Sequence, residues 1–209
     1  MPMRPAAVRF LALGDSYTIG EGVPREGGWP AQLRALLGGA GVAIAAPEIL
    51  ATTGWTTDEL SAAMDANPPE PPYDLVTLLI GVNDQYRGRG VDAYRDGFRA
   101  LLGRAVALAG DIARRVIVVS IPDWGVTPFA QASGRDTARI AREIDGFNEL
   151  AREAALGAGA SFADVTGISR QAESAALLVD DGLHPSAAQY AHWAAAILPL
   201  AMQALEAET

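Results

Sequence analysis

The chain has 209 residues, half of them hydrophobic and a fifth charged, which is typical of one globular domain spanning residues 1–209. Its net charge of −9 argues against a nucleic-acid partner, which normally needs a basic patch, and gives no support for binding to anionic membranes. The absence of cysteine excludes disulfides, thiol catalysis and thiolate metal sites.

Apolar runs alternate with helical patterns along the chain. Strands are predicted at 8–13, 43–50, 75–80, 116–121 and 161–165. Helices are predicted at 29–37, 57–64, 91–109 and 137–156, and from about Ser186 onward. The unbroken apolar run 116–119 is typical of a strand buried on both faces, as in a parallel sheet. The alternation predicts the α/β class: a three-layer α/β/α sandwich around a five-stranded parallel sheet.

No segment has the pattern of a membrane span. The apolar stretch 187–205 contains Gln189, His192 and Pro199, which favours an amphipathic helix that covers the sheet. Arg4 and Arg9 precede a short apolar run, as in a signal peptide, but no cleavage site follows. We therefore expect a cytoplasmic protein without stable membrane insertion, with an added export leader as the alternative.

The first predicted strand ends in Gly14-Asp15-Ser16, and a serine at the carboxyl end of a buried strand is well placed to be a nucleophile. A hydroxyl needs a base, and His184 is one of only two histidines. Asp181 lies three residues before His184, a spacing that allows its carboxylate to orient the imidazole. Asp180 competes for this role. The structural alternatives are a helix N-cap for the serine, a hydrogen-bonded structural histidine and a turn-forming aspartate.

Two further segments offer donors for a developing oxyanion. Asn83 can supply a side-chain N–H, Gly54 a backbone N–H without a Cβ in the way, and Ser16 its own N–H at a helix start. A turn glycine and a capping asparagine are the alternatives at the first two positions.

Other residues near these segments receive supporting roles. Asp15 and Asp84 are expected to organise loops by hydrogen bonding, and Tyr17 to pack beneath the site. Trp55 and Trp124 are candidates for lining a substrate pocket, with ordinary packing as the alternative. Trp29, Trp193 and His192 are interpreted as structural.

Together these segments resemble the GDSL, or SGNH, hydrolase family. Its first block is matched by Gly14-Asp15-Ser16-Tyr17, with tyrosine in place of the usual leucine, and its second, a lone glycine, by Gly54. Its Gly-x-Asn-Asp block is matched by residues 81–84 and its Asp-x-x-His block by Asp181 and His184. The matches follow the family's order over nearly the whole chain.

The resemblance implies a flavodoxin-like sandwich with a triad of Ser16, His184 and Asp181. It implies oxyanion donors from Ser16, Gly54 and Asn83, and hydrolysis of small-molecule esters through an acyl-serine without metal or other cofactor. An acyltransferase or thioesterase would use the same site.

Other classes of protein receive less support from the sequence. Asp180, Asp181 and His184 could cluster around a metal, but the chain has no His-Glu-x-x-His. Nucleotide-binding glycine motifs are absent, and Ser16 lies outside a Gly-x-Ser-x-Gly elbow. A non-catalytic ligand-binding protein of the same fold is a further alternative. The substrate, its acyl-chain length and the oligomeric state are left open.

Overall fold

The computed structural model describes residues 7–206, within which one five-stranded sheet forms the middle layer. Its strands are β1 (Phe10–Gly14), β2 (Glu48–Ala51), β3 (Leu75–Leu79), β4 (Val116–Val119) and β5 (Ser161–Ala163). They are all parallel and lie in the order β2-β1-β3-β4-β5. The predicted α/β class and five-stranded parallel sheet are confirmed, and the strand order is that of flavodoxin-like folds.

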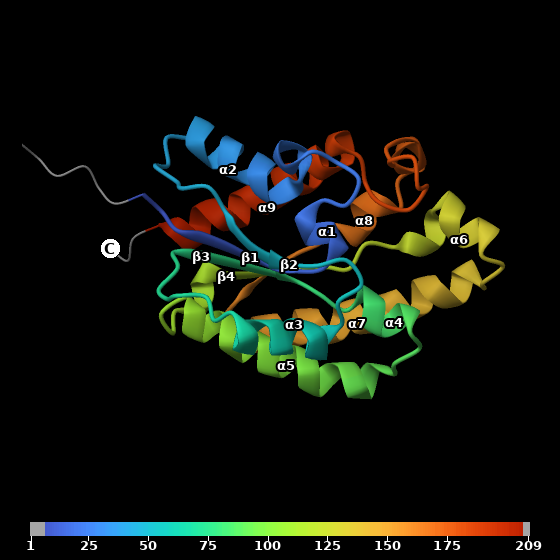
Figure 1. The fold of residues 1–209 in the computed structure, drawn as a ribbon, viewed down its shortest axis with the longest axis horizontal. Helices are drawn as coiled ribbons and strands as arrows, with labels where there is room; N and C mark the ends of the chain where they lie inside the picture. The colour runs from blue at the N-terminus through green and yellow to red at the C-terminus, as the bar shows by residue number, and fades with distance from the viewer. Residues whose placement is uncertain (1–6, 207–209) are drawn as a thin grey trace, which may run out of the picture.

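Helices cover both faces of the sheet, as Figure 1 shows with the sheet seen nearly edge-on. On one face lie α1 (Ser16–Ile19), α2 (Trp29–Gly39), α8 (Thr166–Ser169) and α9 (Ala187–Leu205). On the other lie α3 (Thr57–Ala66), α4 (Val82–Tyr86), α5 (Val91–Leu108) and α7 (Thr137–Gly157). The short α6 (Pro128–Ala132) precedes α7 at one end of the molecule. The predicted three-layer sandwich is confirmed.

Burial on both faces explains the unbroken apolar runs of the central strands. Every residue of β1, β3 and β4 is buried, whereas the edge strand β2 is only half-buried. Tyr94 of α5 stacks on Phe147 of α7 at 4.5 Å between ring centroids, which joins two helices of one layer. On the other face α9 packs against α2, as expected of a covering helix.

The long predicted helices are all present, with ends shifted by at most a few residues. The short helices α1, α4, α6 and α8 were not predicted, because four or five residues are too few to show a 3.6-residue period. The predicted strand at 43–50 starts later, since most of 43–46 is exposed and only Ile44 forms a bridge, to Val8. No helix in the described range is long and apolar enough to cross a bilayer, and the cytoplasmic location stays a prediction.

The strand order reverses between β1 and β3, which are neighbours in register from Phe10↔Leu75 to Gly14↔Leu79. In open α/β sheets, ligands bind in the crevice outside the carboxyl ends of strands at this point. The segments that follow β1 and β3 carry Ser16 and Asn83, so the topology brings these two residues to one edge.

Candidate active site

Ser16 is the first residue of α1 and is buried at the end of β1. Asp15 caps this helix, its Oδ1 accepting from the Tyr17 N–H at 3.0 Å. Gly14 is required by close packing, because a Cβ there would lie 2.1 Å from Thr18 Oγ1 and 2.4 Å from the Leu79 carbonyl oxygen. The Gly-Asp-Ser sequence therefore allows the chain to pass directly from a buried strand into a short helix, and it places the serine hydroxyl at the start of that helix.

His184 links Ser16 to Asp181. Its Nε2 lies 3.0 Å from Ser16 Oγ, and its Nδ1 lies 2.6 Å from Asp181 Oδ2. The second carboxylate oxygen of Asp181 accepts the backbone N–H groups of Leu183 at 2.8 Å and His184 at 2.9 Å. The aspartate is thus held by the same turn that carries the histidine, as the three-residue spacing predicted. Asp180 is exposed and is not the partner of the imidazole.

The charge on Asp181 determines which imidazole nitrogen carries the proton. Burial opposes ionisation, but hydrogen bonds from the His184 side chain and from the two backbone N–H groups outweigh it and lower the pKa of Asp181. An ionised carboxylate only accepts hydrogen bonds, so Nδ1 must donate to it. Nε2 is then free to accept the proton of the Ser16 hydroxyl.

Gly54 lies in a turn at the mouth of the same site. The turn is closed by the Trp55 N–H, which donates to the Thr52 carbonyl at 3.2 Å. Gly54 has φ of +86° at the third position, the conformation that a type II turn demands of this position and that favours glycine. Asn83 lies in the first turn of α4 and donates from Nδ2 to the Trp55 carbonyl at 2.9 Å. Because an amide nitrogen carries two hydrogens, the second is available to another acceptor.

A cavity of about 210 Å³ joins these groups. Its polar side is formed by Ser16, Thr53, Gly54, Asn83 and His184, so the structure brings together the segments picked out in the sequence. Its apolar side is formed by Tyr17, Val82, Tyr86, Trp124, Phe129 and Leu183.

The two tryptophans proposed for the pocket differ in position. Trp124 lines the cavity, and its Nε1 donates to Gln85 Oε1 at 2.8 Å, which fixes the orientation of the indole. Trp55 is not among the lining residues, although its neighbour Gly54 is; its side chain packs against the core. The sequence singled out neither Tyr86 nor Phe129, although the segment 122–133, which contains Phe129, is one on whose packing the acyl pocket was expected to depend. Tyr86 lies three residues after Asn83, on the same side of a helical turn, which is the one signal that could have found it.

The supporting residues lie where they were expected. Tyr17 is buried with its ring 5.4 Å from that of His184. Asp84 accepts from the Thr57 N–H at 3.0 Å and the Thr57 hydroxyl at 2.9 Å, and forms an ion pair with Arg89. The predicted loop-organising hydrogen bonds of Asp15 and Asp84 are confirmed.

Asp15 and Asp84 are buried acids with altered titration. Burial, reinforced by the charge of Asp84, raises the pKa of Asp15 to about 8 although the Tyr17 N–H opposes the shift. Asp15 Oδ2 is buried and has no hydrogen-bond partner in the described structure. Burial also raises the pKa of Asp84, against its bonds from Thr57. Asp15 therefore carries its proton at neutral pH.

Within residues 7–206, no three His, Asp or Glu side chains gather in a way that could hold a metal ion. Asp180, Asp181 and His184, the trio considered for this role, form no such group in the described range; Asp181 bonds to the imidazole, and Asp180 is exposed.

Comparison with known proteins defines the class to which this fold and this site belong. Residues 12–192 match the GDSL-like Lipase/Acylhydrolase family, and the chain belongs to that family. It is accordingly a hydrolase of the GDSL/SGNH type. A search of curated proteins found no match.

Solved structures show the same fold. The crystal structure of TesA has a TM-score of 0.71 at 21% identity, covering 94% of this chain and 99% of that one. A lipase/acylhydrolase from Enterococcus faecalis has a TM-score of 0.74 at 18% identity, covering 97% and 99%. A variant of Axe2, an acetyl-xylooligosaccharide esterase from Geobacillus, has a TM-score of 0.69 at 19% identity, covering 96% and 95%.

Proposed function

We propose that this chain is a serine hydrolase of carboxylic esters that works through an acyl-serine intermediate. The observation that carries the proposal is the chain of contacts from Ser16 Oγ through His184 to Asp181, at 3.0 and 2.6 Å. These are hydrogen-bond distances for a nucleophile, its base and the group that orients the base.

In the first half-reaction His184 Nε2 accepts the proton of Ser16 as Oγ attacks the ester carbonyl. Asp181 stabilises the imidazolium that forms. The oxyanion of the tetrahedral intermediate is stabilised by the backbone N–H groups of Ser16 and Gly54 and by Asn83 Nδ2. His184 then donates its proton to the leaving alcohol, and the acyl group stays on Ser16.

In the second half-reaction water replaces the alcohol. His184 takes a proton from the water as it attacks the acyl-serine, the same donors stabilise the second oxyanion, and the acid leaves as Ser16 regains its proton. The proposal requires neither metal nor organic cofactor. An acyltransferase or a thioesterase would differ only in the acceptor or in the leaving group.

The volume and the lining of the cavity favour an ester substrate with one small apolar group. A volume of about 210 Å³ lies below the roughly 300–1,000 Å³ that is typical of ligand pockets. Its aromatic wall of Tyr86, Trp124 and Phe129 favours an uncharged acyl or alcohol moiety. The structural neighbours include a lipase/acylhydrolase and an acetyl-xylooligosaccharide esterase, and the volume favours a short acyl chain, as in the second.

The test is hydrolysis of p-nitrophenyl esters from acetyl to dodecanoyl by the wild type and by Ser16→Ala. We expect the highest kcat/KM at two to six carbons and a loss of at least about 10³-fold in the variant. Ser186→Ala is the matched control, because Ser186 is a serine near His184 whose buried hydroxyl has no partner in the part of the chain that the structure describes. Labelling with a serine-reactive phosphonate provides a second readout. A wild type that neither hydrolyses any ester nor forms a phosphonate adduct at Ser16 would contradict the proposal and favour a ligand-binding protein.

A further inference from the structure

In the turn that carries Gly54, Trp55 packs against the core, but the three residues before it have little packing of their own. Thr52 and Thr53 are exposed and Gly54 is only half-buried. Glycine visits negative and positive φ about equally, so such a turn has alternative conformations within reach. An oxyanion donor contributes most when its direction is set before the reaction begins. The N–H of Gly54 therefore needs support from outside the turn.

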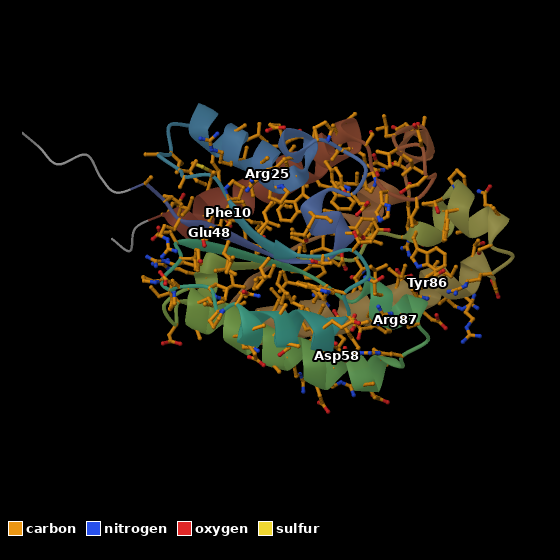
Figure 2. The ribbon with its side chains drawn as sticks, in the orientation of Figure 1. Phe10, Arg25, Glu48, Asp58, Tyr86 and Arg87 are labelled. Atoms are coloured by element: carbon orange, nitrogen blue, oxygen red, sulfur yellow. The ribbon has the colours of Figure 1, made fainter. Side chains whose placement is uncertain are left out.

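Arg87 provides such support. Its Nη2 donates to the Gly54 carbonyl at 2.6 Å, and its Nη1 donates to Glu59 Oε1 at 3.2 Å. Glu59 in turn accepts the Thr56 N–H at 2.9 Å as part of the capping box of α3. One guanidinium thus joins the glycine turn to the start of a regular helix. Figure 2 shows Arg87 where α4 approaches α3.

Asn83 and Arg87 act on the same turn. They are four residues apart, Asn83 in the first turn of α4 and Arg87 at the C-cap that follows it, a spacing that places both on one helical face. Asn83 donates to the Trp55 carbonyl and Arg87 to the Gly54 carbonyl, so two successive peptide groups are held by donors from α4 and its C-cap. On the far side of the turn, the Thr53 hydroxyl bonds to the Glu21 carboxylate.

We propose that Arg87 is a positioning residue that fixes the Gly54 turn so that its N–H points at the oxyanion. The proposal rests on the ester hydrolase function proposed above. Arg87 does not line the cavity and has no contact with the reacting atoms. Its effect is exerted through the Gly54 carbonyl.

The chemistry of arginine suits this task. A guanidinium is a planar fork that satisfies a carbonyl and a carboxylate at once, whereas the ammonium of lysine is a single point charge. The side chain of Arg87 is 43% exposed and that of Glu59 is 41% exposed, so their ion pair adds little to folding stability. Removal of Arg87 therefore affects the turn more than the fold.

The experiment compares Arg87→Ala, Arg87→Lys and Arg95→Ala on a short-chain p-nitrophenyl ester. Arg95 is the matched control, because its side chain is 41% exposed and its ion pair is with Asp92 of the same helix. For Arg87→Ala we expect kcat to fall about 10- to 100-fold, less than the roughly 10²–10³-fold loss on removing a donor outright. KM and the thermal midpoint are expected to stay close to wild type. The kcat of Arg87→Lys should lie between those of the wild type and Arg87→Ala.

Two further readouts distinguish positioning from a loss of structure. Millimolar guanidinium should restore part of kcat in Arg87→Ala and leave Arg95→Ala unchanged. The rate of phosphonylation of Ser16 should fall in parallel with kcat, because the phosphoryl oxygen uses the same donors.

An active wild type with an equally active Arg87→Ala would overturn the positioning role alone. A loss of kcat that follows a lowered thermal midpoint and is not restored by guanidinium would also overturn it. An inactive wild type that no phosphonate labels would overturn this role together with the proposed function.

Discussion

Replacement of Asp15 by asparagine tests the burial of an acid beside the proposed nucleophile. Asp15 is fully buried, accepts one backbone N–H through Oδ1 and has no partner at Oδ2 among residues 7–206. Asparagine has nearly the same shape and keeps an acceptor for the Tyr17 N–H. It removes the ionisable proton and little else, so the helix cap of α1 is expected to persist.

The size of the effect on the free energy of unfolding follows from the raised pKa of Asp15. In the unfolded chain Asp15 loses its proton near pH 4, whereas in the folded protein it keeps it until about pH 8. Between these values the folded state binds more protons, so the contribution of Asp15 to stability is greatest below pH 4 and is lost as pH rises through 8. At about 1.4 kcal/mol per pKa unit, the shift from 3.8 to about 8 corresponds to at most on the order of 6 kcal/mol.

Urea unfolding of the wild type and Asp15→Asn at several pH values between 4 and 8 measures this difference. The free energy of unfolding of the variant should rise relative to wild type as pH increases, by several kcal/mol over the range. Any unsatisfied amide N–H in the variant lowers its free energy of unfolding by an amount that does not change with pH. Asp92→Asn, at a carboxylate that is 85% exposed, should show no such trend. A difference between Asp15→Asn and wild type that stays flat, or falls with pH, would refute the reasoning.

Three further predictions concern the candidate active site and Gly81, a glycine with no room for a Cβ. Asp181→Asn should lower kcat about 10³–10⁴-fold, because an amide that donates to Nδ1 leaves the proton on Nε2; equal kcat in steady-state assays would contradict this. Asn83→Ala should lower kcat about 10²–10³-fold with little change in KM, measured on the same ester. Gly81→Ala should destabilise the fold by about 2–4 kcal/mol, since φ is +127° and a Cβ would lie 2.5 Å from the buried Tyr94 ring. Gly103→Ala, on an open face of α5, is its control and should be neutral or stabilising in urea titrations.

Local patterns in the sequence predicted much of the fold. The five apolar runs predicted the five strands, and burial on both faces explains the continuous apolar sequence of the three central ones, β1, β3 and β4. The long helices were predicted because each is long enough to repeat its apolar face several times. The Asp181–His184 contact was also predictable, since the two side chains lie within a single turn of backbone.

Adjacency in sequence was a poor guide to which side chains face the cavity. Trp55 follows the cavity-lining Gly54, yet its indole packs against the core, because successive residues in a turn point in different directions. Tyr86 and Phe129 were missed because α4 and α6 are too short to show a period.

The alternation of strands and helices, the residue types available for catalysis and the turn that pairs Asp181 with His184 can all be read from the amino-acid sequence. They follow from interactions between residues a few positions apart. The contact of Ser16 with His184 across 168 positions, the bond of Arg87 to the Gly54 carbonyl across 33, and the aromatic wall on one side of the cavity are visible only in the folded chain. These contacts depend on how the packed layers align at the carboxyl edge of the sheet, which no local pattern of residues encodes.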